Sequence, residues 1–177
     1  NKISSRQDLE GKISAPFLGD IPKSESQDEI INTNSKSSSA EAIRIIRTNM
    51  EFMFSKISEN KSKTVFITST IPKEGKTLVA INLASTIALS GKKVLLIGLD
   101  IRNPKIDRYV KLPSKGLTNY LSKSNENIHD YIVKLDDFEN FFVLPSGVVP
   151  PNPVDLLMNN RIDDMFAQLK TEYDYII

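Results

Sequence analysis

The stretch from Ser69 to Thr77, S-T-I-P-K-E-G-K-T, combines the residue types that bind phosphate groups. It follows the apolar run Val65–Ile67 and precedes a helical pattern that starts at Leu78. A loop that closes into a helix N-terminus points several backbone N–H groups at one place and adds the positive end of the helix dipole. The order of strand, loop and helix therefore predicts a phosphate loop that binds a nucleoside triphosphate.

The side chains of this loop have separate predicted tasks. Lys76 reaches the outer phosphates as a point charge, the Thr77 hydroxyl binds Mg²⁺, and Gly75 lets the backbone approach the ligand. The loop is poor in glycine, because Thr70 and Lys73 stand where Gly or another small residue is common. The alternative is a turn that only connects a strand to a helix. The predicted nucleotide-binding residues are Pro72, Lys73, Glu74, Gly75, Lys76, Thr77 and Leu78.

A second apolar run extends from Lys93 to Arg102 and begins after Ser90-Gly91-Lys92, which ends the preceding helix. The two runs and the helix between them form a βαβ unit. Continuous apolar strands indicate burial on both faces, hence a parallel sheet covered by helices. Asp100 then lies at the carboxyl end of a central strand, where open α/β sheets bind their ligands. A helix cap or a surface turn is the alternative for this residue.

Other elements complete the predicted domain. Residues 40–58 carry apolar side chains at steps of three and four, which predicts an amphipathic helix packed on the sheet. The prolines of residues 145–153 predict an irregular loop. The fold class is α/β, with a mostly parallel central sheet flanked by helices, as in P-loop NTPases. The remaining expected elements are helices at 116–121, 128–135, 154–159 and 162–170, and strands at 141–144 and 174–177.

Composition excludes several classes of protein. The 23 Lys and Arg nearly balance the 22 Asp and Glu, so electrostatics does not favour nucleic acid as a partner. The absence of cysteine excludes disulfides and Cys-based metal sites, and the single histidine, His129, excludes a His cluster. No apolar run approaches the roughly 18 residues that a membrane helix needs. The five tyrosines are scattered, which favours packing or surface exposure over phosphorylation.

Four stretches resemble the bacterial tyrosine kinases that form the cytoplasmic domain of capsular and exopolysaccharide co-polymerases. Ser69–Thr77 looks like their Walker A loop, and Val94–Arg102 is similar to their second, Asp-bearing motif. Residues 144–157, L-P-S-G-V-V-P-P-N-P-V-D-L-L, match their most specific signature. Residues 41–50 resemble their E-x-x-R-x-x-R helix through Glu41, Arg44 and Arg47.

The resemblance implies an ATP- and Mg²⁺-dependent protein-tyrosine autokinase. Its catalytic residues would be Lys76, Asp100 and Arg102, with Thr77 and Asp100 on the metal. Residues 1–39 would be a juxtamembrane linker after a membrane anchor in the same polypeptide, and residues 40–177 the kinase domain. The expected partners are further copies in a ring-like homo-oligomer and the polysaccharide export machinery, at the cytoplasmic face of the bacterial inner membrane. We expect no nucleic acid partner.

Two departures from the family pattern bear on activity. Gly98 stands where the second motif has its first aspartate, so one carboxylate of the expected Mg²⁺ and general-base apparatus is missing. The family's Walker B aspartate would follow a strand like Tyr173–Ile177, where this sequence stops, and the acceptor tyrosine-rich tail is absent too. We interpret the domain as C-terminally truncated.

Alternatives remain at this point. A partition- or cell-division-type P-loop ATPase would have a signature lysine at the position of Ile71. A non-catalytic module that binds nucleotide and assembles would agree with Gly98. For the helix at 40–58, the alternative to subunit contact is ion pairing within the helix, Glu41 with Arg44 and Arg47 with Glu51. For the proline-rich loop, it is a rigid entry into the next helix.

Overall fold

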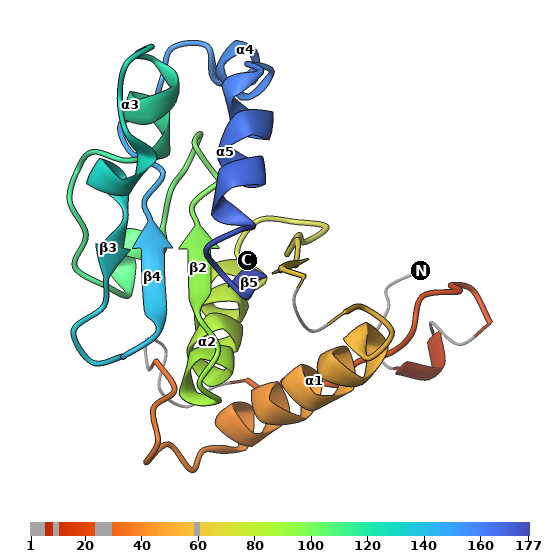
Figure 1. The fold of residues 1–177 in the computed structure, drawn as a ribbon. Helices are drawn as coiled ribbons and strands as arrows, with labels where there is room; N and C mark the ends of the chain where they lie inside the picture. Colours follow the sequence, from red (N-terminus) through yellow and green to blue (C-terminus); the bar gives the residue numbers. More distant parts are fainter. Residues whose placement is uncertain (1–5, 9–10, 24–29, 59–60) are drawn as a thin grey trace.

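A computed structural model describes residues 6–8, 11–23, 30–58 and 61–177. Its centre is a five-stranded sheet in the order β1-β5-β2-β4-β3 (Figure 1). All strands run parallel except β3, which pairs antiparallel with β4 at one edge. The expected mostly parallel sheet is therefore confirmed. The strands are β1 (Lys63–Thr64), β2 (Val94–Ile97), β3 (Val133–Lys134), β4 (Phe141–Leu144) and β5 (Tyr175–Ile176).

Helices cover the sheet on both faces. Side chains of β2 alternate between two hydrophobic clusters: Val94 and Leu96 face α2, whereas Leu95 and Ile97 face the opposite layer. All four β2 residues are buried, as a continuous apolar strand in a parallel sheet predicts. One layer holds α2 (Lys76–Leu89) and α1 (Ser38–Phe54); the other holds α3 (Leu117–Leu121), η3 (Ile128–Tyr131), α4 (Pro153–Leu157) and α5 (Arg161–Leu169).

Helix α1 packs mainly against α2 (Figure 1) and meets the sheet at its C-terminal end, where the Phe54 ring lies 6.4 Å from that of Tyr175 in β5, so the prediction that it packs on the sheet is confirmed only in part. Ile43 and Met50 are buried at this contact, whereas Met53 is 46% exposed. Ile57 lies beyond the helix end at Phe54. The reason is that α2 already packs on this face of the sheet, so most of α1 lies outside α2.

The segment 128–135 is not the helix that we predicted. It forms the short 3₁₀ helix η3, which the Asn127 side chain caps by accepting from the His129 N–H, and then strand β3. Ile132 has extended backbone angles, and Val133 pairs with Val143 of β4. Two successive β-branched residues beside a free sheet edge favour the strand.

The two strands of the predicted βαβ unit are not neighbours, because β5 lies between β1 and β2. Strand β1 covers Lys63 and Thr64, and the ladder continues one step further through a 2.8 Å bond from Val65 N to Ile176 O. Phe66 is 75% exposed, so the expectation of burial on both faces is wrong for this edge.

The N-terminal segment docks on the helical layer. The Ile31 N–H donates to Asn82 Oδ1 of α2 at 2.7 Å, and Asn49 Nδ2 of α1 donates to the Leu18 carbonyl at 2.8 Å. Ile31 is buried in the same core as α1 and α2. Ser24 and Ser26 of the predicted linker lie outside the described residues. Among the helices in the described ranges, none combines the length and apolar character needed to cross a bilayer.

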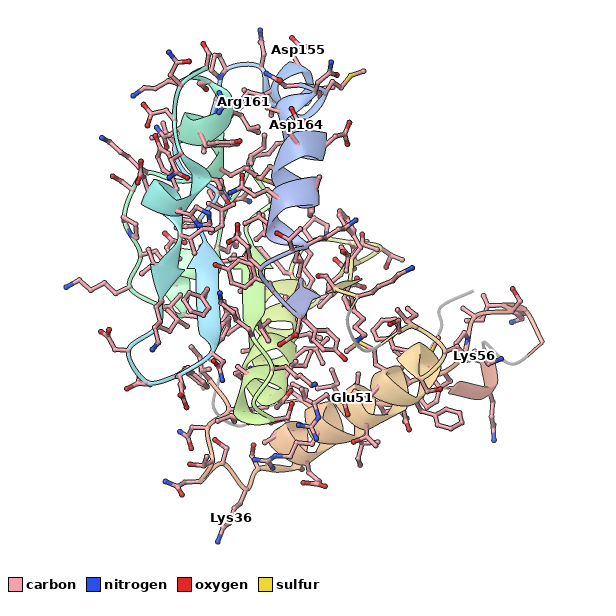
Figure 2. All side chains as sticks on the ribbon, viewed as in Figure 1. Lys36, Glu51, Lys56, Asp155, Arg161 and Asp164 are labelled. Carbon is pink, nitrogen blue, oxygen red and sulfur yellow. The ribbon has the colours of Figure 1, made fainter. Side chains whose placement is uncertain are left out.

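The opposite layer is held by a contact between α5 and α3. Arg161 lies at the start of α5 (Figure 2). Its guanidinium lies 4.2 Å from the ring centre of Tyr120. Its Nη2 also donates to the Glu126 carbonyl at 3.4 Å. Stacking of a guanidinium on an aromatic ring stabilises this layer, which supports the loops that follow β2 and β4.

Candidate functional site

The phosphate loop lies between β1 and α2 and turns through two left-handed residues. Lys73 has φ 70° and Gly75 has φ 92°. Gly75 is the N-cap of α2 and provides no side-chain cap, and no acidic residue lies in the first helical turn. The first N–H groups of this helix therefore remain available to an anion.

The exposed side chain of Glu74 braces the loop. Its carboxylate accepts hydrogen bonds from the Thr70 hydroxyl and from the Ile71 N–H, each at 3.2 Å. Glu74 and Leu78 line a hollow shared with residues 19–23, on a different side of the loop from the main groove. Of the predicted nucleotide-binding residues, Pro72, Lys73, Gly75, Lys76 and Thr77 line the main groove. Glu74 and Leu78 can contribute there only through their backbone.

The end of β2 brings a carboxylate to the phosphate loop. Lys76 Nζ lies 3.3 Å from Asp100 Oδ2, although the two residues are 24 positions apart in the chain. The other carboxylate oxygen of Asp100 accepts from the Asn103 N–H at 3.0 Å, which orients the side chain. Asp100 therefore also has the turn-forming role that the sequence left open as an alternative, because one oxygen of its carboxylate closes this turn while the other faces Lys76.

A groove of about 1030 Å³ runs along the loop and past Asp100 and Arg102. Sequence reasoning missed Lys105, Arg108 and Tyr109, which also line it. The sequence did contain a clue to these residues, because three basic residues follow Asp100 within eight positions. With Lys73 and Lys76, they give the groove a strongly basic lining that suits phosphate groups.

A smaller hollow of about 260 Å³ opens beside this groove at the carboxyl edge of the sheet. It is lined by Lys76, Thr77, Gly98, Asp100 and Ser146, together with apolar residues that follow β1. Ser146 belongs to the proline-rich loop after β4. The structure therefore brings this loop to the site, and the same loop also leads into α4, whose first residue is Pro153.

The donors at this site fit a magnesium ion bound together with phosphates. Thr77 and Asp100 both line the hollow and supply a hydroxyl and a carboxylate. Within the described ranges, no three His, Cys, Asp or Glu side chains gather in a metal-binding group. Mg²⁺ typically takes one or two protein oxygens and completes its shell with substrate phosphates and water, so this sparse set is compatible with it.

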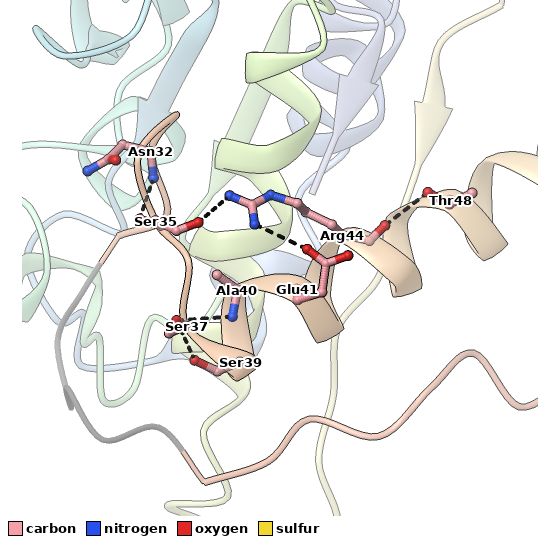
Figure 3. Close-up of polar contacts among 8 residues, drawn as sticks. All are labelled: Asn32, Ser35, Ser37, Ser39, Ala40, Glu41, Arg44 and Thr48. Carbon is pink, nitrogen blue, oxygen red and sulfur yellow. Dashed lines mark hydrogen bonds and ion pairs between the residues drawn. The ribbon is translucent and has the colours of Figure 1, made fainter.

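The predicted oligomerisation residues make contacts within the chain. Arg44 Nη2 donates to the Ser35 carbonyl at 2.7 Å and Nη1 pairs with Glu41 at 3.4 Å (Figure 3). Arg47 Nη1 donates to the Thr86 carbonyl of α2 at 3.0 Å and its Nε lies 3.7 Å from Glu51. Both ion pairs of the intrahelical alternative are present, and a role in subunit contact stays a prediction.

Tyrosines in the described core are poor phosphate acceptors. Tyr120, Tyr131, Tyr173 and Tyr175 are buried, and burial raises the pKa of Tyr173 to about 12. A buried neutral phenol cannot reach a groove at the molecular surface. Tyr109 is half-buried beside the groove.

Comparison with known proteins adds family evidence to this geometry. A profile described as "AAA domain" matches residues 62–177. The chain is 38% identical over 149 residues to the tyrosine-protein kinase YwqD of Bacillus subtilis, covering 84% of this chain and 61% of that protein. The chain thus spans about three-fifths of this relative.

Solved structures with a similar fold support the same family relationship. The chimeric protein CapA2B2 superposes with a TM-score of 0.82 at 32% identity, over 98% of this chain and 74% of that one. The kinase domain of the Escherichia coli tyrosine kinase ETK superposes with a TM-score of 0.84 at 28% identity, over 99% of this chain and 72% of that one. The α/β fold of the P-loop type that the phosphate loop predicts for this chain is therefore confirmed. By sequence match the chain belongs to the AAA-domain family, and it is similar in sequence and in structure to bacterial tyrosine-protein kinases.

Proposed function

We propose that this protein transfers the γ-phosphoryl group of ATP to protein tyrosine, including its own, and so regulates capsular or exopolysaccharide synthesis and export. The observation that carries the proposal is the 3.3 Å approach of Lys76 Nζ to Asp100 Oδ2. This distance supports the proposal, because Lys76 would bind phosphate and Asp100 would accept a proton, and the two side chains meet where the outermost phosphate of a loop-bound nucleotide would end.

Each residue has a definite task in this reaction. The loop N–H groups and Lys76 hold the phosphates, and Thr77 and Asp100 are the candidate ligands of Mg²⁺, which would neutralise developing charge on the phosphate oxygens. Arg102 lines the groove and can pair with a phosphate oxygen. The phenolic oxygen forms the new bond to the γ-phosphorus while the bond to the ADP oxygen breaks. Asp100 accepts the phenolic proton.

Self-association through α1 belongs to the same proposal. The side chain of Glu41 is 65% exposed, so it is available to a neighbouring copy even though Arg44 lies beside it. A ring of copies at the cytoplasmic face of the membrane would bring the acceptor tyrosines of one copy to the groove of another. The docked N-terminal segment would then connect each copy to its membrane anchor and to the export machinery.

The test is incorporation of phosphotyrosine by the full-length protein with Mg²⁺ and ATP. Lys76→Met removes the cation from the phosphates and should abolish labelling. Lys92→Met is the matched control, because Lys92 is exposed at the turn after α2, away from the site. Labelling that survives Lys76→Met would refute the kinase assignment.

A non-catalytic assembly module is a second candidate, because Gly98 leaves Asp100 as the only acidic side chain among the described residues that line the smaller hollow. It predicts nucleotide binding without phosphotyrosine in the wild type. A partition-type ATPase instead predicts release of phosphate from ATP without phosphotyrosine. The same preparation, assayed for all three outcomes, separates these functions.

A further inference from the structure

Ser146 is a buried polar residue at the site with no assigned task. It is 5% exposed and lines the smaller hollow together with Lys76, Thr77 and Asp100. Among the described residues its hydroxyl has no hydrogen-bond partner, although its backbone carbonyl accepts from Thr118 N at 3.0 Å. This hydroxyl is not one of the fully buried polar atoms without a partner in the described part of the chain, so it is accessible from the hollow and a ligand there can bond to it.

The fold fixes this hydroxyl in place. The start of α3 holds the loop through bonds from Leu117 N to the Pro145 carbonyl, at 2.8 Å, and from the Thr118 hydroxyl to the Val148 carbonyl, at 2.7 Å. Gly147 takes φ 83°, a left-handed angle that lets the loop turn directly after Ser146. Ser146 is thus held from both sides and cannot relax away from the hollow.

Gly98 makes the close approach of Ser146 possible. A Cβ at position 98 would lie 2.5 Å from Ser146 Oγ and 2.8 Å from Ser146 N. The serine hydroxyl therefore occupies the space into which a side chain at 98 would project. With the loop in this position, a carboxylate at 98 does not fit.

The order of the strands indicates what Ser146 faces. The phosphate loop follows β1, Asp100 follows β2 and Ser146 follows β4, on the far side of β2 from β1. A group beyond the outermost phosphate, on the side of β4, would therefore meet Ser146. The rest of the hollow has apolar walls that include Val65, Phe66 and Ile106, which suit an aromatic ring.

We propose that the Ser146 hydroxyl hydrogen-bonds the phenolic oxygen of the acceptor tyrosine and positions it for Asp100. This inference rests on the proposed kinase function and names a substrate-binding residue for it. A serine hydroxyl both donates and accepts, so it can hold the phenol without competing for its proton. In this arrangement Ser146 orients the acceptor tyrosine, and Asp100 removes its proton.

The decisive test compares two peptides that differ by one hydroxyl. A fluorescent peptide with a single Tyr and its Phe counterpart are titrated into the full-length protein with ADP and Mg²⁺, and anisotropy gives both affinities. The wild type should prefer Tyr by about three- to ten-fold, the worth of one hydrogen bond. Ser146→Ala should abolish the preference, and Ser146→Thr should keep it.

ADP affinity is measured on the same variants and should stay within about two-fold, because Ser146 is not placed on the nucleotide. Equal Tyr and Phe affinity in the wild type, or an unchanged preference in Ser146→Ala, would overturn the inference. A loss of ADP affinity in Ser146→Ala would also overturn it and assign Ser146 to the nucleotide. The binding test does not depend on phosphotyrosine formation, so its failure is distinct from failure of the kinase assignment.

A second pair of variants tests the contact with Gly98. Gly98→Ala should lower the melting temperature and reduce the Tyr preference, because its methyl group displaces Ser146. The double variant Gly98→Ala with Ser146→Gly should recover only part of the melting temperature, because the contact with the Ser146 backbone N remains, and it should not recover the preference. A Gly98→Ala protein that keeps both wild-type values would show that the loop does not confine Ser146, against the inference.

Discussion

The ammonium of Lys76 lies 3.3 Å from the carboxylate of Asp100 and joins the phosphate loop to the end of β2. Both side chains remain more than a third exposed, so water screens their attraction. An incoming anion must share Lys76 with Asp100. The pair therefore links nucleotide binding to the group that we assign as proton acceptor.

Asp100→Asn should separate binding from transfer. Removing the competing charge should leave ADP, measured calorimetrically without Mg²⁺, bound equally or up to about five-fold more tightly, as expected for a half-exposed pair worth ~0.2–1 kcal/mol. Phosphoryl transfer should fall by about 10²-fold or more, because the proton acceptor is gone. Asp107→Asn, at an exposed acid in the neighbouring η2 (Ile106–Arg108), is the control. Weaker ADP binding in Asp100→Asn would contradict this reading of the pair.

Arg47→Ala should destabilise the folded chain itself. Its guanidinium donates to the Thr86 carbonyl between α1 and α2, and loss of such a charged hydrogen bond costs about 1.5–3 kcal/mol. Urea unfolding measures this loss. Glu41→Ala should change the free energy of unfolding by no more than about 0.5 kcal/mol, because its side chain is exposed.

This difference provides a clean test of self-association. If α1 mediates subunit contact, Glu41→Ala should lower the mass found by light scattering while the protein stays as stable as the wild type. An unchanged mass would leave Glu41 with its intrahelical role alone. Arg47→Ala is the poorer probe, because a lower mass could follow from the weakened α1–α2 packing.

Asn82→Ala should release the N-terminal segment from α2. The substitution leaves the buried Ile31 N–H without the acceptor that it has at 2.7 Å, which costs about 1–3 kcal/mol. Hydrogen exchange should show loss of protection at Ile31. Asn49→Ala is the matched control, because its bond to the Leu18 carbonyl is exposed and should cost about 1 kcal/mol or less. Equal protection in both variants would argue against Asn82 as the anchor.

Stability should fall in alkaline solution because of Tyr173. Burial raises the pKa of this phenol to about 12, whereas in the unfolded chain it ionises near pH 10. Between these values the unfolded state binds fewer protons than the native state, so the free energy of unfolding decreases as pH rises from about 10 toward about 12. Burial also raises the pKa of Tyr175, which adds to the same trend.

Denaturant unfolding at about pH 9 and about pH 11 measures this slope. Tyr173→Phe should reduce it, because the substituted ring has no proton to lose. Tyr175→Phe in addition should reduce it further. A slope that stays the same in the double variant would show that other groups cause the alkaline loss.

Local patterns in the sequence were sufficient to predict the parts of the site that are continuous in the chain. The phosphate loop, the start of α2 at Lys76 and the buried strand that leads to Asp100 are each set by neighbouring residues: a turn that needs Gly75, a helix after it, and an apolar run. The polarity of neighbouring residues and the spacing of apolar ones can be read within a short stretch of a single sequence. The site therefore contains the predicted Lys76, Thr77 and Asp100.

Other features depend on which segments meet in space. The insertion of β5 between β1 and β2, the strand at 133–134 and the outer position of α1 follow from pairing and packing partners that lie far along the chain. The hydrogen bonds of Glu74 to Thr70 and Ile71 and the approach of Ser146 to Gly98 also required the folded loops. The sequence by itself thus determined the phosphate-binding chemistry, because that chemistry lies in one loop. Only the tertiary structure decided that the Ser146 hydroxyl, from the loop after β4, occupies the space beside Gly98, because the packing of α3 on that loop sets its position.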